Sequence, residues 1–376
     1  MEFRDLKKQY EYLKVEMDKA INNVIIDSHF IMGSQVTELE KRLAEYVKKK
    51  HCITCGNGTD ALQLALMAWG IGYGDAVFVP DFTFFSSGEV VSMAGATPIF
   101  VDVYDDTYNI QIESLKTMIE KVKKEGKLVP KVIIAVDLFG QPANYEEIKE
   151  IAKENNMFIL EDAAQGFGGK IGKDVACSFG DISTTSFFPA KPLGCYGDGG
   201  AIFTDNDEWD AMIRSLKVHG KGTSKYDNVR IGMNSRLDTL QAAVLLTKFN
   251  VFVKEEMESV QIIAKQYTNE LTGIVKTPVV LDGYVSSWAQ YTIQLEDKRQ
   301  REGLQEHLKK NNVPSMIYYQ KPMHCQKAFE YITYTNSDYP VTNRLCDTVL
   351  SLPFHPYMRN DEVLRVTDFI KEYLKV

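Results

Sequence analysis

One lysine and one aspartate indicate the chemistry that this sequence can perform. Asp162 follows the apolar run Met157-Phe-Ile-Leu160, and Lys191 lies 29 positions later in the run Ser186-Phe-Phe-Pro-Ala-Lys191-Pro-Leu-Gly-Cys-Tyr-Gly-Asp-Gly-Gly200. A lysine amine can hold an aldehyde as a Schiff base, and a carboxylate can keep a pyridine nitrogen protonated so that the ring accepts electrons. Pyridoxal phosphate needs one group of each kind. The pair therefore predicts a site for this cofactor.

Both residues also have a plainer structural interpretation. Asp162 could simply cap the turn Ala163-Ala-Gln165, and most lysines are solvent-exposed. The surroundings of Lys191 argue for a site, because prolines flank it at 189 and 192 and glycines follow at 194, 197, 199 and 200. Surface helices and strands rarely have this composition. The run predicts a tight loop whose backbone approaches a ligand.

The segment Asn57-Gly-Thr-Asp-Ala-Leu62 is a candidate for binding the cofactor phosphate. Gly58 lets the backbone come close to a ligand. Thr59 supplies a hydroxyl, and the helix predicted after it supplies free N–H groups at an N-terminus that favours anions. Ordinary helix capping explains the same residue types equally well.

Apolar runs and helical patterns alternate through the first two thirds of the chain, which is typical of an α/β fold. Short continuous apolar strands of this kind indicate a mostly parallel sheet covered on both faces. Such sheets bind ligands at the carboxyl ends of their strands, where Asp162 should lie. The predicted strands are Val77–Val79, Pro98–Val101, Val132–Val136, Phe158–Leu160, Thr184–Phe188 and Ala201–Thr204, and the predicted helices are Thr59–Trp69, Thr83–Ala94, Ile110–Lys124, Tyr145–Asn155 and Glu208–Val218.

The last third of the chain has a different pattern. A helical stretch from about Leu237 to Leu271 leaves the sheet layer, and a small α+β unit should follow it. We therefore predict a large cofactor-binding domain over residues 1–250, which includes the N-terminal segment, and a small C-terminal domain over residues 251–376. The elements predicted for the small domain are a strand at Ala289–Leu295, a helix at Arg301–Asn311, a strand at Met316–Tyr319 and a final helix from Asp361.

Composition limits the classes of partner. The chain has 376 residues and a net charge of −8, from 43 basic and 51 acidic side chains. This balance argues against nucleic acid or an anionic membrane as the main partner. No apolar run reaches the ~18 residues of a membrane span, and the charged start Met1-Glu-Phe-Arg-Asp5 does not resemble a signal peptide. We expect a cytoplasmic protein.

The six cysteines are too scattered for a disulfide scaffold. The run His51-Cys-Ile-Thr-Cys55 has the C-x-x-C spacing of redox and zinc sites, but no second such pair completes a four-ligand set. The run predicts a short strand in which small cysteines pack as apolar residues. We expect no metal.

Six blocks of sequence together resemble the DegT/DnrJ/EryC1/StrS family of sugar-nucleotide aminotransferases, within the fold-type-I pyridoxal phosphate enzymes. The resemblance covers nearly the whole chain, and six blocks in one order and spacing are more specific than any single block. It implies a large, mostly parallel sheet domain flanked by helices and a smaller C-terminal α+β domain. The blocks are Asn57-Gly-Thr-Asp-Ala-Leu62, Pro80-Asp-Phe-Thr-Phe84, Glu161-Asp-Ala-Ala-Gln165, Ser186-Phe-Phe-Pro-Ala-Lys191, Gly197-Asp-Gly-Gly200 and Gly232-Met-Asn-Ser-Arg-Leu-Asp238.

The resemblance implies a role for each matching residue. Lys191 would bind the cofactor aldehyde and shuttle a proton, and Asp162 would pair with the pyridine nitrogen. Gln165 would bond the ring hydroxyl, and Phe84 would stack on the ring. The phosphate would be held by Gly58, Thr59, Ser186 and, from the neighbouring subunit, Asn234. Each site of the homodimer would then need two chains.

The family usually takes the amino group from glutamate and gives it to a keto-sugar nucleotide. The run from Lys191 to Gly200 is similar to that of enzymes that aminate C3, in particular on UDP-linked 2-acetamido-3-keto sugars, including the glucuronic acid form used in surface polysaccharides. Lipopolysaccharide or another glycolipid is a related destination. Amination at C4, or of a dTDP-linked sugar, is the alternative.

By family position, the sugar-nucleotide side of the site would be lined by Phe30, Arg236, Tyr318 and Tyr319. Arg236 could bind a carboxylate or phosphate, or it could form an ion pair with Asp238 or another acid. Related enzymes often have His-Tyr where this chain has Tyr318-Tyr319. Dehydratases of this fold replace the lysine with histidine, and a non-catalytic cofactor-binding regulator should lack Lys191, Asp162 or Gln165. This chain has all three.

Overall fold

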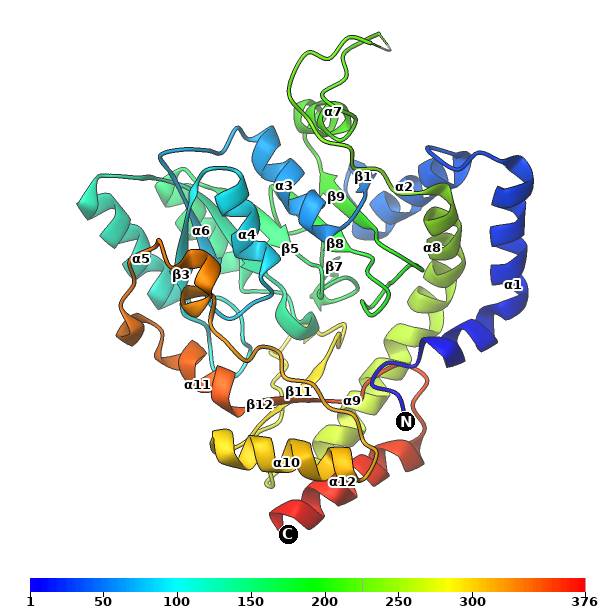
Figure 1. Ribbon diagram of the computed structural model, residues 1–376, viewed down its shortest axis with the longest axis vertical. Coiled ribbons are helices and arrows are strands. Elements are labelled where there is room, and N and C mark those ends of the chain that lie inside the picture. The colour runs from blue at the N-terminus through cyan, green and yellow to red at the C-terminus, as the bar shows by residue number, and fades with distance from the viewer. Residues whose placement is uncertain (225, 376) are drawn as a thin grey trace.

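The computed structural model describes residues 1–224 and 226–375. Its centre is a seven-stranded sheet in the order β1-β9-β8-β5-β4-β2-β3 (Figure 1). Only β9 runs against its neighbours β1 and β8, and the other pairs are parallel. The mostly parallel sheet predicted from the sequence is therefore confirmed. Its strands are β1 His51–Cys55, β2 Asp75–Pro80, β3 Thr97–Val101, β4 Val129–Val136, β5 Phe158–Asp162, β8 Ile182–Ser186 and β9 Gly200–Thr204.

Helices that alternate with the strands pack against this sheet (Figure 1). The central strands are continuous apolar runs and are buried along most of their length, as strands covered by helices require. The five helices predicted in this region are all present, one with the predicted ends and four with shifted ends; they are α3 Gly58–Ala68, α4 Ser86–Met93, α5 Ile112–Glu125, α6 Tyr145–Asn155 (as predicted) and α7 Asp207–Leu216. None of the helices within residues 1–224 and 226–375 is both long and apolar enough to cross a bilayer.

Two N-terminal helices, which the sequence analysis did not predict, pack with α8 (Thr239–Val251) beside the sheet. They are α1 (Leu6–Asp27) and α2 (Ser34–Val47), and Figure 1 shows them in blue at the right of the molecule. The buried positions 36, 39, 43 and 47 of α2 recur at helical spacing. A narrow apolar stripe is enough to hold these helices in place, because each packs against α8.

A second hydrophobic core lies below the sheet in Figure 1 and extends from Val260 to Ile370. It joins α9 (Met257–Leu271) and α10 (Lys298–Lys310) to the antiparallel strands β11 (Tyr291–Gln294) and β12 (Val349–Leu352). The predicted helical stretch up to Leu271 is continuous, because α8 runs through a π-helical turn at Phe252–Glu256 into α9. The predicted domain boundary at residue 250 falls inside this stretch and stays a prediction. The other α-helices and strands of the described residues are α11 Pro340–Thr348, α12 Asn360–Leu374, and the short strands β6 Lys170–Ile171, β7 Asp174–Val175 and β10 Tyr284–Val285, which form a small sheet.

The strand predicted at Met316–Tyr319 is wrong. Only Met316 pairs with a strand, through two hydrogen bonds to Ser351 at 3.1 and 2.7 Å. The chain then turns toward the sheet domain, where the hydroxyl of Tyr319 accepts a hydrogen bond from Gln165. Contact with Gln165 thus replaces continued pairing with β12.

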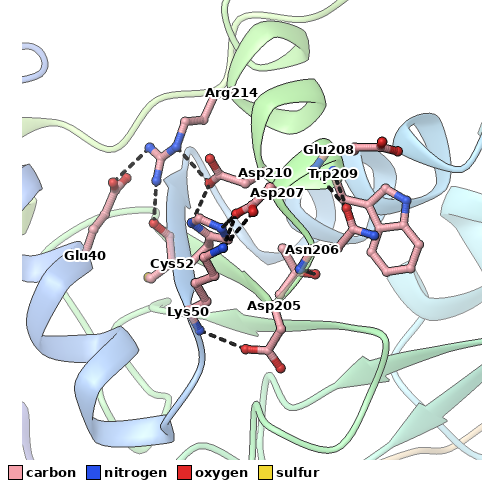
Figure 2. Close-up of polar contacts among 12 residues, drawn as sticks. Glu40, Lys50, Cys52, Asp205, Asn206, Asp207, Glu208, Trp209, Asp210 and Arg214 are labelled. Carbon is pink, nitrogen blue, oxygen red and sulfur yellow. Dashed lines mark hydrogen bonds and ion pairs between the residues drawn. The ribbon is translucent and has the colours of Figure 1, made fainter.

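The C-x-x-C run forms β1, as predicted, and all six cysteines are free. Cys52 and Cys55 are buried, and burial raises the pKa of both thiols. Within the described residues no group of three or more His, Cys, Asp or Glu side chains could hold a metal ion. Arg214 of α7 fixes this edge strand by donating to the carbonyl of Cys52 and to the carboxylates of Glu40 and Asp210 (Figure 2).

Candidate active site

Asp162 is the last residue of β5 and is buried at the carboxyl edge of the sheet. Its Oδ1 accepts from the backbone N–H of Ala164 at 3.2 Å, so Asp162 does cap the turn that follows β5. Its Oδ2 accepts from the hydroxyl of Ser87 at 2.8 Å. Burial raises the pKa of this carboxyl, while the Ser87 bond and the charge of Lys191 lower it. Sequence reasoning missed Ser87.

Lys191 lies in the loop between β8 and β9, as the proline and glycine pattern predicts. The loop is folded on itself, because the N–H of Lys191 donates to the carbonyl of Phe188 at 2.9 Å and that of Cys195 to Phe187 at 2.8 Å. Burial lowers the pKa of the Lys191 amine to about 8, although Asp162 raises it. An amine with this pKa is partly neutral near pH 7 and can act as a nucleophile or a base.

Gly58, Thr59 and Ser186 come together where α3 begins and β8 ends. A Cβ added to Gly58 would lie 2.7 Å from the Cβ of Ser186, so only glycine fits without a shift. The Thr59 hydroxyl lies 2.8 Å from that of Ser86, the first residue of α4. Two helix N-termini and three hydroxyls thus surround one place, which suits a phosphate group. Ser86 was not foreseen.

We predict that Gly58→Ala weakens cofactor binding by about tenfold or more, since the added methyl group pushes Ser186 out of place. Titration of cofactor-free protein with pyridoxal phosphate, followed by its absorption, measures the effect. Gly72→Ala is the matched control, because its Cβ would meet nothing closer than 3.6 Å. Equal affinities in the two variants would exclude a phosphate site at Gly58.

Gln165 and Tyr319 close another side of the site. The side-chain Oε1 of Gln165 accepts from the backbone N–H of Phe139 at 2.8 Å, and its side-chain Nε2 donates to the Tyr319 hydroxyl at 3.0 Å. The ring centroid of Tyr319 lies 6.3 Å from that of Phe84 and 5.7 Å from that of Tyr318. Phe84 is 53% exposed, so a face of its ring is free to stack on a ligand.

Phe30, Asn234 and Arg236 are not joined to this cluster. The backbone carbonyl of Phe30 accepts from the N–H of Thr239 at 2.9 Å. Asn234 is exposed, and its backbone forms an antiparallel bridge with that of Val218. Within the described residues, no hydrogen bond or ion pair connects the three side chains to Lys191 or Asp162. Nor does Arg236 form the alternative ion pair with Asp238 or any other described acid. Its guanidinium is available for a ligand.

The residues that meet at the sheet edge fit pyridoxal phosphate. They supply a buried carboxylate for a ring nitrogen, a lysine of low pKa for an aldehyde, a free aromatic face and a cradle for a phosphate. One set of side chains thus offers a partner to each of the cofactor's polar groups. The role of each single residue stays a prediction.

Comparison with known proteins identifies the class. The model of the DegT/DnrJ/EryC1/StrS aminotransferase family matches residues 11–371. A relative from Pseudomonas aeruginosa, UDP-2-acetamido-2-deoxy-3-oxo-D-glucuronate aminotransferase, is 41% identical over 95% of this chain and 96% of its own. The pleiotropic regulatory protein of Geobacillus stearothermophilus is 37% identical over 99% of this chain and 98% of its own.

Solved structures agree with the sequence matches. A DegT/DnrJ/EryC1/StrS aminotransferase from Brucella abortus superposes with a TM-score of 0.97 and 46% identity over the full length of both chains. A Bacillus subtilis protein that contains the cofactor PMP, the amine form of pyridoxal phosphate, has a TM-score of 0.86 and 26% identity over 97% of this chain and 82% of its own. This chain belongs to the DegT/DnrJ/EryC1/StrS aminotransferase family. The fold, the pyridoxal phosphate cofactor and the sugar-nucleotide aminotransferase class predicted from the sequence are confirmed.

Proposed function

We propose that this aminotransferase takes its amino group from glutamate and delivers it to C3 of a UDP-linked 2-acetamido-3-keto-hexose or hexuronate. The observation that carries the proposal is that the buried Asp162 lies near enough to Lys191, at the carboxyl edge of the sheet, for each charge to shift the pKa of the other group. The name of the Pseudomonas aeruginosa relative supports the choice of sugar and of C3. Such products suit the synthesis of surface polysaccharides or glycolipids.

Pyridoxal phosphate, when bound, supplies an electron-accepting ring and a carbon that carries the amino group between the two substrates. Lys191 would hold the cofactor between reaction cycles and would move a proton to and from the reacting carbon of the substrate. Asp162 would keep a positive charge on the ring nitrogen, and Gln165 would bond the ring hydroxyl. Gly58, Thr59 and Ser186 would hold the phosphate, and Phe84 would cover the ring.

The side chains proposed to bind the substrate form fewer hydrogen bonds and ion pairs than those proposed to bind the cofactor. Arg236 has no acidic partner in the described part of the chain, so its guanidinium can bind an anionic group of the sugar nucleotide bidentately. Phe30, Tyr318 and Tyr319 provide apolar surface and hydroxyls for the sugar and the base. We retain the division into a cofactor domain at residues 1–250 and a smaller domain at 251–376, because the second core from Val260 to Ile370 supports it.

Product structure tests the position of amination. We expect the enzyme, given glutamate and a UDP-2-acetamido-3-keto sugar, to form 2-oxoglutarate and a 3-amino sugar nucleotide. A pocket that brings C3 within the ~3–3.5 Å needed for bond formation holds C4 too far away. NMR of the product reads the carbon directly. An amine at C4 would overturn the C3 assignment and leave the aminotransferase class intact.

Arg236→Ala tests whether the sugar carries a carboxylate. If Arg236 binds the C6 carboxylate, the variant should lose about tenfold or more in kcat/KM for the uronic acid substrate and little for the neutral sugar. Arg236→Lys should recover only part of the loss, because a lysine cannot bind bidentately. Equal losses on both sugars would assign Arg236 to a phosphate group or to structure.

We also propose a homodimer with shared sites, in which Asn234 reaches the phosphate bound by the partner. Asn234 is exposed, and no described contact ties it to Thr59 or Ser186 of its own chain. A closed two-fold interface is the commonest way for two identical chains to exchange residues. A monomer would then be inactive.

Mixing two variants, each of which lacks one half of the proposed site, tests whether the site is shared. Lys191→Ala and Asn234→Ala chains, once exchanged, form mixed dimers in which one site receives both intact residues and the other receives neither. Activity should recover to about half that of the wild type in the mixed dimer, well above either parent. Native mass spectrometry verifies the exchange. Complete exchange without recovery would show that each site is built from one chain.

The name of the Geobacillus stearothermophilus relative makes a non-catalytic regulator the second candidate. Such a protein should lack one of the three residues that act on the cofactor, but Lys191, Asp162 and Gln165 are present and meet at one edge of the sheet. Turnover of glutamate with a keto-sugar nucleotide separates the two candidates, since a regulator binds the cofactor without producing 2-oxoglutarate.

A further inference from the structure

The N-terminal segment reaches the loop that carries Lys191. The guanidinium of Arg4 donates to the backbone carbonyl of Lys191 at 2.8 Å and to that of Pro192 at 3.4 Å. These contacts join residues 187 and 188 positions apart. A charged donor on a carbonyl forms a stronger hydrogen bond than a neutral one, so Arg4 is a firm anchor for this backbone.

A second cation holds the other end of the same loop. The amine of Lys248, on α8, is buried and donates to the carbonyl of Gly194 at 2.8 Å, and it lies 4.3 Å from the ring centroid of Tyr196. Burial lowers the pKa of Lys248 to about 8 and also lowers that of Arg4, while the buried Glu256 raises both. Arg4 and Lys248 thus hold backbone carbonyls in two parts of the loop, at residues 191–192 and 194.

The segment that carries Arg4 is itself attached to the second core. The N–H of Phe354 donates to the carbonyl of Phe3 at 3.0 Å, and the amine of Lys8 bonds Glu362 of α12 at 3.1 Å. Figure 1 shows the N-terminus beside α9 and α12, below the sheet. Arg4 therefore bridges the C-terminal part of the molecule to the lysine loop.

We propose that Arg4 is a positioning residue for Lys191, which fixes the backbone of that lysine and keeps a positive charge beside its side-chain amine. The proposal rests on Lys191 being the cofactor lysine of the proposed function. Among the described residues, the charges of Asp162 from β5 and Arg4 from the N-terminal segment act on the amine. Asp162 favours the protonated amine, and Arg4 opposes it. Arg4 thereby adds to burial in offsetting the carboxylate that the cofactor requires.

The sign of the effect follows from this balance. Removal of the Arg4 charge leaves burial alone to oppose Asp162, so the pKa of Lys191 should rise and a smaller fraction of the amine should be neutral at pH 7. Only the neutral amine reacts with an acylating reagent or with the cofactor aldehyde. A merely structural role of the N-terminal segment would not move this titration.

The test is the pH dependence of Lys191 labelling in the full-length, cofactor-free protein. Trace acetic anhydride labels each lysine in proportion to its neutral fraction, and mass spectrometry of the peptide reads Lys191. In Arg4→Met we expect labelling at pH 7 to slow by about threefold or more, with the midpoint moved to higher pH. Arg4→Lys, which keeps the charge, should restore most of the wild-type midpoint.

Lys8→Met is the matched control, because it removes the attachment of the same segment to Glu362 without changing a charge that faces Lys191. Its midpoint should equal that of the wild type. The proposal is overturned if Arg4→Met keeps the wild-type midpoint, or if Lys8→Met shifts it equally. Borohydride trapping in the wild type is run in parallel. Failure to trap cofactor on Lys191 would refute the proposed function, whereas trapping with an unmoved midpoint would refute only the role of Arg4.

Discussion

Lys191→Ala should abolish amino transfer, with a loss of about 10⁴-fold or more, while the protein keeps its fold. The variant loses both the group that holds the cofactor covalently and the base that moves the proton, and general acid–base catalysis alone contributes about 10²–10⁴-fold. The fold survives because Lys191 is only half-buried and its backbone bonds to Phe188 and Arg4 do not involve the side chain. Single-turnover kinetics with glutamate measure the loss.

The wild-type protein should be yellow, and the variant should lack the visible band that a lysine-linked cofactor gives. Lys173→Ala, at an exposed position, is the control and should keep both colour and activity. Circular dichroism and thermal unfolding of Lys191→Ala should match the wild type. A variant that still converts glutamate at the wild-type rate would contradict the assignment of Lys191.

Asp162→Asn should lower amino transfer by about a hundredfold or more and leave the cofactor bound. The substitution removes the charge that stabilises a protonated ring nitrogen but keeps almost the same shape, and the loss of a single electrostatic partner in a closed site commonly costs 10²–10³-fold. The amide oxygen can still accept from the hydroxyl of Ser87 or the N–H of Ala164. Stopped-flow measurement of each half-reaction reads the loss directly.

Ser87→Ala gives the comparison for this site. The hydrogen bond from Ser87 lowers the pKa of Asp162, so its removal should raise that pKa. The substitution leaves the carboxylate itself in place. Its loss of rate should therefore be much smaller than that of Asp162→Asn. If Asp162→Asn reacts at the wild-type rate, or if both variants lose equally, the charge of Asp162 has no role in the reaction.

Much of the sheet could be predicted because its strands are short apolar runs between helical patterns. Val132–Val136 is buried throughout, and in Phe158–Leu160 only Phe158 is partly exposed, so the apolar residue types of these runs identify them as strands. The stripe at 36, 39, 43 and 47 in α2 has helical spacing and could also have been predicted. The conformation of Met316–Tyr319 could not be predicted. Its residue types favour a strand, but Tyr319 forms a hydrogen bond with Gln165, which is distant in the sequence.

The residues of the site likewise fall into those that the sequence reveals and those that only the fold reveals. Lys191, Asp162 and the run Gly58-Thr59 stand next to glycines, strand ends or helix starts, which are visible in the sequence. Ser87 and Arg4 are ordinary residues in ordinary surroundings, and only the fold brings them to Asp162 and Lys191 from 75 and 187 positions away. Residues that act through a bond to a functional residue leave no local pattern to find.

The most direct test of the central claim is the position at which the cofactor is bound. Borohydride reduction of the purified protein should fix a pyridoxyl phosphate group covalently, and mass spectrometry of the digest should place it on the peptide that contains Lys191 and on no other. Addition of glutamate before the borohydride should prevent the labelling, because the lysine is then released. A label on another lysine, or none in a protein that still transfers amino groups, would contradict the account.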